Sequence, residues 1–284
     1  MGVLPYKVHY ENSRGETVRL DEPPLLLKEG ELFNVRWRLS TARRPMGEGE
    51  RLLYGRRQCE ERTVTVAVAA GSTEQLAAVL ERLNAVMEYD LHSGRAGRLW
   101  VGEQYLSCWC TASTKKLSCD FPSIAEVQLK LYPESPAWCT ERVYRFTTGG
   151  SEEVSGHKYP CGYPRRYGTG NRELVMNNRS VAPAPMRIVF YGAAVNPRLL
   201  AGGSDIGINI SLDEGEYAVI DQLAREVYMV DRAGVRTNCF DKRRKNGMTF
   251  NNVPSGSSTV QVVSGGRVDI TLVEQRSEPR WTTA

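Results

Sequence analysis

The chain has 284 residues, of which 41% are hydrophobic and 25% are charged, and these globular values exclude a wholly disordered protein. Its net charge of +4 is small for a protein dedicated to nucleic-acid binding, and no apolar run approaches the roughly 18–20 residues that a membrane-spanning helix needs. Three histidines are too few to favour a histidine-based metal or proton-transfer site.

Apolar and polar residues alternate with a period of two through much of the sequence, and this pattern predicts half-buried β-strands. In chain order the alternating segments are 33–39, 63–68, 126–132, 186–190, 206–212 and 260–272. The last segment contains a Ser-Gly-Gly turn at 264–266, which predicts that its two halves pair as a hairpin.

One segment has the period of a helix instead. Ser72 is placed to cap it, and Gln75 three residues later completes a capping box. The apolar residues then fall on one stripe, which consists of Leu76, Val79, Leu80, Leu83, Val86 and Met87. We therefore expect a helix over residues 72–88 that covers one face of a sheet.

The predicted strands form two groups, separated by a segment rich in proline and glycine between residues 133 and 164. Residues 1–140 hold several strands and the helix, and residues 141–284 hold strands alone. The predicted fold class is mainly β. It comprises two β-sandwich-like domains over these ranges, with the helix packed on the sheet of the first.

The seven cysteines are odd in number and scattered, which argues against a disulfide framework. The first 28 residues lack the pattern of a secretory signal peptide, so we expect folding in the reducing cytoplasm. Cys108, Cys110, Cys119 and Cys139 could together form a four-thiolate zinc site. Alternation along a strand instead favours a buried stripe that includes Cys108 and Cys110, and we expect no metal.

Catalytic signatures are missing from the sequence: it has no nucleophile elbow, no zinc-protease helix motif, no Walker A loop and no dinucleotide fingerprint. The glycine-rich segment 202–207 precedes a strand, whereas a phosphate cradle requires a helix. The acidic run 213–216 and the basic run 242–245 carry turn signals. We therefore expect loops and turns at these places, no catalytic residues, no cofactor and no enzymatic activity.

The interval between the strands at 33–39 and 63–68 is long for a hairpin loop and rich in arginine, proline and glycine. This composition indicates an arm that projects from the domain. Exposed arginines suit protein interfaces because the planar guanidinium pairs with carboxylates. The sequence predicts an interface made by Arg43, Arg44, Arg51, Arg56 and Arg57.

Aromatic residues support an alternative to a protein that acts through interfaces alone. This alternative is a β-sandwich module that binds cell-wall carbohydrate during adsorption to a host. Sugar-binding sandwiches present an exposed aromatic surface, and aromatic side chains also serve in cores and interfaces. The candidates are Trp100, Tyr105, Trp109, Tyr159, Tyr163 and Tyr167.

Several motifs occur in a fixed order along the chain. The N-terminal part carries Tyr10-x-Asn12-Ser13-x-Gly15, then Gly97-Arg98-Leu99-Trp100-Val101-Gly102 and Tyr105-Leu106-x-Cys108 after the helix. The C-terminal part carries Tyr159-Pro160-x-Gly162-Tyr163-Pro164, Gly215-Glu216-Tyr217-x-Val219-Ile220-Asp221, Asn238-x-Phe240, Phe250, Pro254-x-Gly256 and Glu278-Pro279-Arg280-Trp281. In this order the motifs resemble those of the distal tail protein (Dit) family of long-tailed bacteriophages and prophages, and the resemblance runs nearly end to end.

The resemblance implies a structural adaptor at the tip of a phage tail, assembled in the cytoplasm of the bacterial host. Six copies would form a ring that joins the tail tube protein to the tail-tip hub protein and contacts the tape measure protein. The N-terminal domain would build the ring. The C-terminal domain, expected to be galectin-like, would hold receptor-binding or baseplate proteins. DNA would pass through the lumen without specific binding, and no membrane would be involved.

Overall fold

The computed structural model describes residues 7–44, 46–146 and 173–280, and the chain divides into two compact units. The first unit comprises Met1–Thr140 together with Arg276–Ala284, and the second comprises Glu141–Gln275. The final residues, which the sequence analysis placed in the second domain, thus belong to the first unit. Whether 1–140 and 141–284 act as independent domains stays a prediction.

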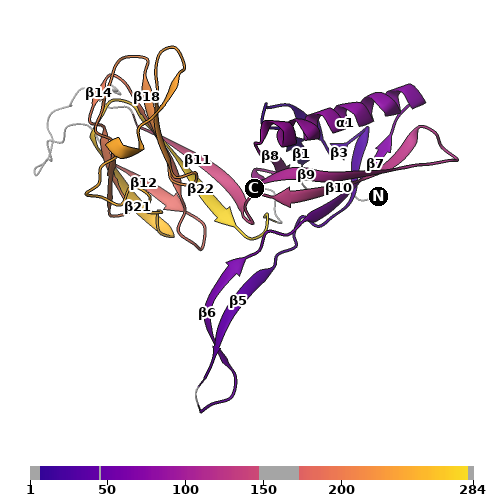
Figure 1. The fold of residues 1–284 in the computed structure, drawn as a ribbon, viewed down its shortest axis with the longest axis horizontal. Helices are drawn as coiled ribbons and strands as arrows, with labels where there is room; N and C mark the ends of the chain where they lie inside the picture. The colour runs from indigo at the N-terminus through magenta and orange to yellow at the C-terminus, as the bar shows by residue number, and fades with distance from the viewer. Residues whose placement is uncertain (1–6, 45, 147–172, 281–284) are drawn as a thin grey trace, which may run out of the picture. The chain divides into compact units, whose positions relative to one another are not determined.

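An antiparallel sheet forms the body of the first unit (Figure 1). Neighbouring strands follow the order β1-β8-β9-β10-β7-β4-β3, with β2 beside β1. Their bounds are β1 (Val8–Glu11), β2 (Thr17–Arg19), β3 (Asp21–Glu22), β4 (Leu25–Gly30), β7 (Arg62–Ala69), β8 (Gly97–Val101), β9 (Gln104–Leu117) and β10 (Ile124–Pro133). The predicted strands at 63–68 and 126–132 are confirmed as β7 and β10, which pair directly.

The sheet of the first unit closes on itself at Leu20, the one residue between β2 and β3. The Leu20 amide donates to the Val8 carbonyl at 2.9 Å on one side, and its own carbonyl accepts from the Leu27 amide at 2.7 Å on the other. The curled sheet encloses a core to which every second residue of β7 contributes, namely Val64, Val66 and Val68. Closure leaves this sheet few unpaired edges.

The helix α1 (Thr73–Ser93) covers the sheet with the stripe that the sequence predicts, since Leu76, Leu83, Val86 and Met87 are buried. Ser72 caps it, accepting from the Gln75 amide at 3.2 Å, while the Gln75 side chain accepts from the Gly71 amide, one residue earlier than in an ordinary capping box. The helix runs five residues beyond the predicted end. It ends only at Gly94, whose φ of 64° an L side chain rarely adopts.

A buried carboxylate fixes the last turn of α1 to the sheet. Asp90 is fully buried, and it accepts from the Tyr10 hydroxyl and from the Ser13 amide, each at 2.7 Å. Burial and the neighbouring Cys108 and Asp90 raise the pKa of Tyr10, so its hydroxyl remains a donor at any physiological pH. Gly97 passes directly over this pair, where a Cβ would overlap both the carboxylate and the hydroxyl.

The second unit is a β-sandwich. One sheet has the order β20-β19-β18-β13-β22-β11, the other has the order β12-β21-β15-β16, and β14 pairs with β17. Their bounds are β11 (Trp138–Phe146, which begins in the first unit), β12 (Glu173–Asn178), β13 (Met186–Tyr191), β14 (Ala194–Val195), β15 (Arg198–Ala201), β16 (Ser204–Gly207), β17 (Ser211–Leu212), β18 (Tyr217–Asp221), β19 (Glu226–Val230), β20 (Arg236–Asn238), β21 (Gly256–Ser264) and β22 (Val268–Arg276). Both sheets contribute to one apolar core. The predicted mainly-β fold class is confirmed, and α1 is the single α-helix of the described residues.

The predicted hairpin at 260–272 is wrong. β21 pairs with β12 and β15, whereas β22 pairs with β13 in the opposite sheet. Both strands turn alternate residues into the core between the sheets, so their pattern is the same whichever partner they take. The predicted strand at 206–212 is interrupted, because β16 ends at Gly207 and β17 begins at Ser211.

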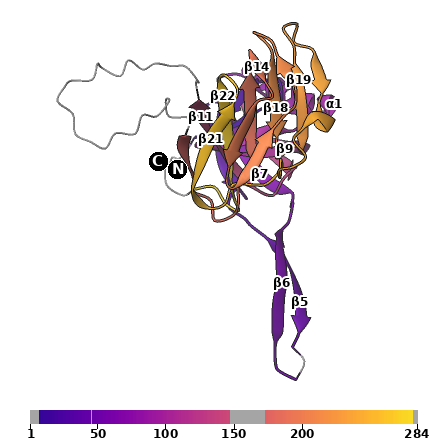
Figure 2. The same ribbon diagram turned by 90° about the vertical axis from the view of Figure 1, so that its left-hand side faces the viewer.

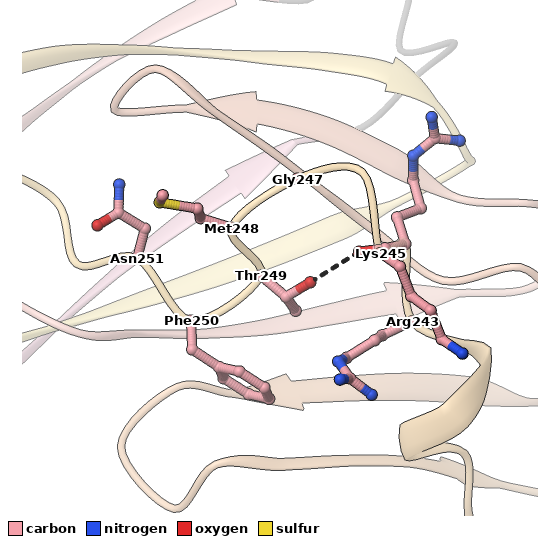
Figure 3. A pocket seen from close by; sticks show the side chains of 8 residues that line it. Arg243, Lys245, Gly247, Met248, Thr249, Phe250 and Asn251 are labelled. Atoms are coloured by element: carbon pink, nitrogen blue, oxygen red, sulfur yellow. Dashed lines mark hydrogen bonds between the residues drawn. The ribbon is translucent and has the colours of Figure 1, made fainter.

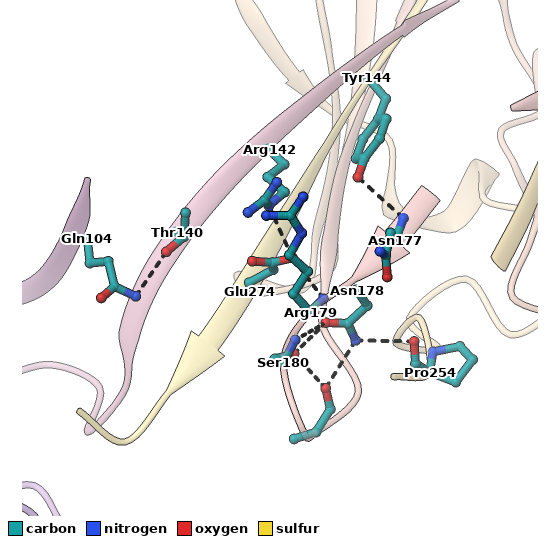
Figure 4. Close-up of polar contacts among 11 residues, drawn as sticks. Gln104, Thr140, Arg142, Tyr144, Asn177, Asn178, Arg179, Ser180, Pro254 and Glu274 are labelled. Carbon is teal, nitrogen blue, oxygen red and sulfur yellow. Dashed lines mark hydrogen bonds and ion pairs between the residues drawn. The ribbon is translucent and has the colours of Figure 1, made fainter. Parts of the chain in front are cut away.

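Polar side chains hold the connection that follows β12 (Figure 4). The side-chain amide of Asn178 donates through Nδ2 to the carbonyls of Ala182, Val253 and Pro254 at 3.0–3.2 Å. The carboxylate of Glu274, 2% exposed, accepts from the Arg179 amide at 2.9 Å and lies 3.2 Å from Arg142 Nε. In the first unit, the Gln104 side chain donates to Thr140 at 3.1 Å and accepts from the Arg280 amide.

No helix in the described part of the chain combines the length and the apolar character needed to cross a bilayer.

Candidate assembly interface

The arginine-rich interval folds into a separate two-stranded hairpin of β5 (Trp37–Arg43) and β6 (Glu50–Arg57), hereafter the arm. It pairs with no other strand of the described residues, and in both views it extends away from the helix-covered sheet of its own unit (Figures 1 and 2). The register joins Trp37 to Arg57 at the base and Arg43 to Glu50 near the tip. The projecting hairpin matches the arm expected from the sequence.

The arm has two faces of different chemistry, because residues opposite each other in a ladder lie on the same face. Trp37 and Leu39 lie on one face with Gly55, whose missing side chain leaves room for both of them. The opposite face carries Arg38 beside Arg56, then Tyr54, then Arg51. The Arg56 guanidinium lies 5.2 Å from the centre of the Tyr54 ring, a cation–π contact that holds the two side chains together.

The positive charge of the protein is concentrated in the arm. Residues 37–57 carry six arginines and two glutamates, a net charge of +4, which equals the net charge of the whole chain. None of these arginines forms an ion pair with any residue that the structure describes. The guanidinium groups are therefore available to a partner.

The structure separates the five arginines that the sequence analysis grouped. Arg51 and Arg56 share the basic face, while Arg43 and Arg57 lie on the other face and Arg44 follows at the tip. Sequence reasoning missed Arg38, which completes the basic face opposite Arg56. Alternate residues of one strand share a face, so Arg38 could have been assigned to the basic face if the strand opposite it had been known.

The alternation over residues 33–39 predicts a half-buried strand, and this prediction is wrong. The strand begins only at Trp37, and the alternating apolar side chains of the arm lie in solvent. The exposed fractions are 48% for Trp37, 60% for Leu39, 56% for Leu52 and Leu53, and 54% for Tyr54. Contiguous exposed apolar side chains are typical of interaction surfaces, and a two-stranded ribbon alone is marginally stable in water.

The base of the arm is anchored firmly. Arg62, 7% exposed, donates to the carbonyls of Glu31 and Leu32 at 2.9 and 3.1 Å and lies over the Trp138 ring. Burial lowers the pKa of Arg62, yet the two carbonyls and the ring still favour its charged form. Arg36 also pairs with Glu60 at 3.0 Å. A projecting element with a fixed base can be presented in one direction to a partner.

The cysteines that the structure describes do not gather into a metal site. Cys108 and Cys110 are buried in β9, and burial raises the pKa of these thiols to about 12 and about 11. No group of three or more residues that could hold a metal occurs within residues 7–44, 46–146 and 173–280. The buried-stripe interpretation of Cys108 and Cys110 therefore agrees with their positions.

We expect the thiols to differ sharply in reactivity. At pH 8, iodoacetamide should label the exposed Cys119 of the native protein while Cys108 and Cys110 stay unmodified, since a buried thiol with a raised pKa yields almost no thiolate. Peptide mass spectrometry after timed labelling measures this. Labelling of Cys108 as fast as Cys119, in protein that remains folded, would contradict the buried placement.

The aromatic residues proposed for sugar binding do not form a common surface among the described residues. Trp100 stacks on His9 with ring centres 5.7 Å apart and donates to Glu11 at 2.8 Å. Tyr105 is buried, and Trp109 is partly buried on β9. The remaining candidates, Tyr159, Tyr163 and Tyr167, lie outside the described residues, as does the motif at 159–164.

Comparison with known proteins identifies the fold. No protein-family model matches the sequence, and no curated protein matches it. The crystal structure of the Dit protein of phage SPP1, described as a paradigm of the hub adsorption apparatus in phages infecting Gram-positive bacteria, is similar with a TM-score of 0.60 at 12% identity. That similarity covers 95% of this chain and 99% of that one. Two structures of the phage P2 baseplate in its activated conformation, with calcium and with strontium, are similar with a TM-score of 0.65 at 9% identity. Each similarity covers 96% of this chain and 99% of the baseplate chain. Over nearly its whole length, the chain therefore has the fold of these phage tail proteins, as the resemblance in its sequence predicts.

Proposed function

We propose that the protein is a structural component of a phage or prophage tail, a distal tail adaptor that carries out no catalytic step. The observation that carries this proposal is the end-to-end similarity to the SPP1 Dit protein, which covers 95% of one chain and 99% of the other. The motifs of the sequence point to the same family independently of the coordinates. In this proposal the protein acts at the tail tip of the virion.

Six copies are proposed to close into a ring through one repeated contact between unlike surfaces, the geometry that generates rings. The arm supports this, because its apolar and basic faces both lack partners within the described chain. Seating the arm on the next copy would bury Trp37 and Leu39 and pair Arg38, Arg51 and Arg56. The proposed neighbours of the ring are the tail tube protein, the tail-tip hub protein, the tape measure protein and receptor-binding proteins, and DNA would pass through its lumen without specific binding.

Electron microscopy of the purified protein, mixed with its own tail tube protein, tests the adaptor role. We expect rings with sixfold symmetry and a central opening, seated on one end of each tube. Tubes without rings at either end, in a sample that contains folded protein in excess, would refute the assignment to the tail tip.

A further inference from the structure

Two adjoining hollows lie on the surface of the second unit. The first, of about 490 Å³, is lined by Arg243, Arg244, Lys245 and residues 247–251 (Figure 3). The second, of about 520 Å³, is lined by Pro183, Gly202, Phe250, Asn251, Asn252 and Pro254. Phe250 and Asn251 line both, so the two hollows adjoin, and together they are called the depression below.

The first hollow is positively charged. Arg243 lies 4.0 Å from the Phe240 ring centre and donates to the Phe240 carbonyl at 2.7 Å, and Lys245 has no ion pair with any described residue. Arg244 pairs with Asp205 at 3.4 Å, but its buried Nε has no partner among the described residues. None of the described residues that line the two hollows carries a carboxylate, so Arg243 and Lys245 leave an excess of positive charge there.

Contacts on several sides fix the turn that carries these cations. The Arg244 amide donates to the Gly207 carbonyl at 2.9 Å, and Gly247 lies so close to the backbone of Asp205 that a Cβ would overlap it. Further along, the Gln222 side chain donates to the Thr249 carbonyl at 2.9 Å. A turn held in this way loses little entropy when it binds a ligand.

Neutral groups that suit a sugar lie beside the cations. The Phe250 ring stacks on Phe240 with centres 5.8 Å apart, and Phe250 is half-buried and lines both hollows. In Figure 3 this ring lies on the same side of the turn as the charged ends of Arg243 and Lys245. Asn252 and Asn251, whose Nδ2 donates to the Ser204 hydroxyl at 2.9 Å, add amide groups with remaining capacity to donate to and accept from hydroxyls.

We propose that this depression binds an acidic glycan, a saccharide that carries phosphate or carboxylate groups. Arg243 and Lys245 would pair with the oxyanion, Phe250 would pack against the apolar face of a sugar ring, and Asn251 and Asn252 would bind its hydroxyls. The proposal does not depend on ring formation, and it gives the second unit a ligand of its own.

Calorimetric titration of the full chain at physiological salt tests the ligand class. The probes are pentamannosyl phosphate, pentagalacturonate, neutral maltopentaose and pentaglutamate. We expect binding of at least one acidic sugar, and the stronger of the two identifies the oxyanion as phosphate or carboxylate. Maltopentaose lacks the oxyanion and pentaglutamate lacks the sugar ring and its hydroxyls. Each should therefore bind at least about tenfold more weakly than the acidic sugar. Binding of neither acidic sugar, or equal binding of pentaglutamate, would overturn the proposal.

Lys245→Glu, with Lys242→Glu as its matched control, tests the position of the site. The two substitutions change charge equally, but only Lys245 lines the hollow. We expect Lys245→Glu to weaken binding about tenfold or more, Phe250→Leu to weaken it with the apolar volume kept, and Lys242→Glu to change it less than about twofold. Equal weakening by both lysine variants would show diffuse attraction and refute the site. Native mass spectrometry should show that every variant has the same number of chains per assembly as the unmodified protein. A loss of glycan binding is then distinguished from a failure of ring assembly.

Discussion

A chain in which Arg38, Arg51 and Arg56 are replaced by glutamate is expected to fold normally and to remain a monomer. These three arginines form the basic face of the arm and have no ion pair within the described chain, so folding does not need their charge. A surface that accepts them on the next copy would instead meet three negative charges, and like charges held together cost several kcal/mol, on the order of a thousandfold in affinity per contact. Native mass spectrometry measures the outcome.

The matched control for this variant replaces Arg225, Arg232 and Lys242 with glutamate. These side chains are exposed, lie in the second unit and have no ion pair within the described residues, so the change in net charge is the same. We expect the control to assemble as the unmodified chain does. Assembly of the arm variant at the same protein concentration as its control would show that the basic face is not part of the interface.

Replacing Gly97 by alanine is expected to destabilise the first unit strongly, although it adds only one methyl group. The added Cβ would overlap the Asp90 carboxylate and the Tyr10 hydroxyl, which are both buried. Overpacking costs about 1–3 kcal/mol, and displacing a buried hydrogen-bonded carboxylate adds about 1–3 kcal/mol. Thermal unfolding followed by circular dichroism should show a Tm lower by on the order of 10 °C.

Gly47→Ala is the control for that measurement. A Cβ at Gly47 would meet only Arg44 Cβ at 3.7 Å, an ordinary contact, so we expect the Tm to stay within about 2 °C of the original value. Asp90→Asn should fall between the two variants, because the amide can still accept from Tyr10. If Gly97→Ala unfolded at the same temperature as Gly47→Ala, the close packing of β8 against Asp90 and Tyr10 would be contradicted.

Local sequence signals predict those elements of the fold that are determined by contacts within one short segment of the chain. Ser72 and the apolar stripe locate α1, because capping and 3.6-residue periodicity act within the helix itself. The end of the helix was missed because nothing in the sequence stops it before Gly94, and the burial of Asp90 depends on Tyr10, eighty residues away. Alternation likewise locates β21 and β22 but not their partners, since it records which side chains face inward and not which strand lies alongside.

The two candidate sites illustrate the same limit in different ways. Length and arginine content indicate the arm, but its basic face needs the register that places Arg38 opposite Arg56. The run 242–245 appears in the sequence as a solvated turn. Only the fold shows that the segment 243–251 curls around a hollow lined by Lys245 and Phe250, and that Pro183 and Gly202, from earlier segments, line a second hollow beside it. A sequence pattern gives the chemistry of each residue, while a site depends on distances between segments.

The native mass of the unmodified protein tests the central claim most directly. Six copies of the 31.8 kDa chain give about 191 kDa, and we expect native mass spectrometry to show this species, with dissociation releasing single chains. A protein that stays at 31.8 kDa across the accessible concentration range, with its fold intact, would contradict the ring that the arm is proposed to close.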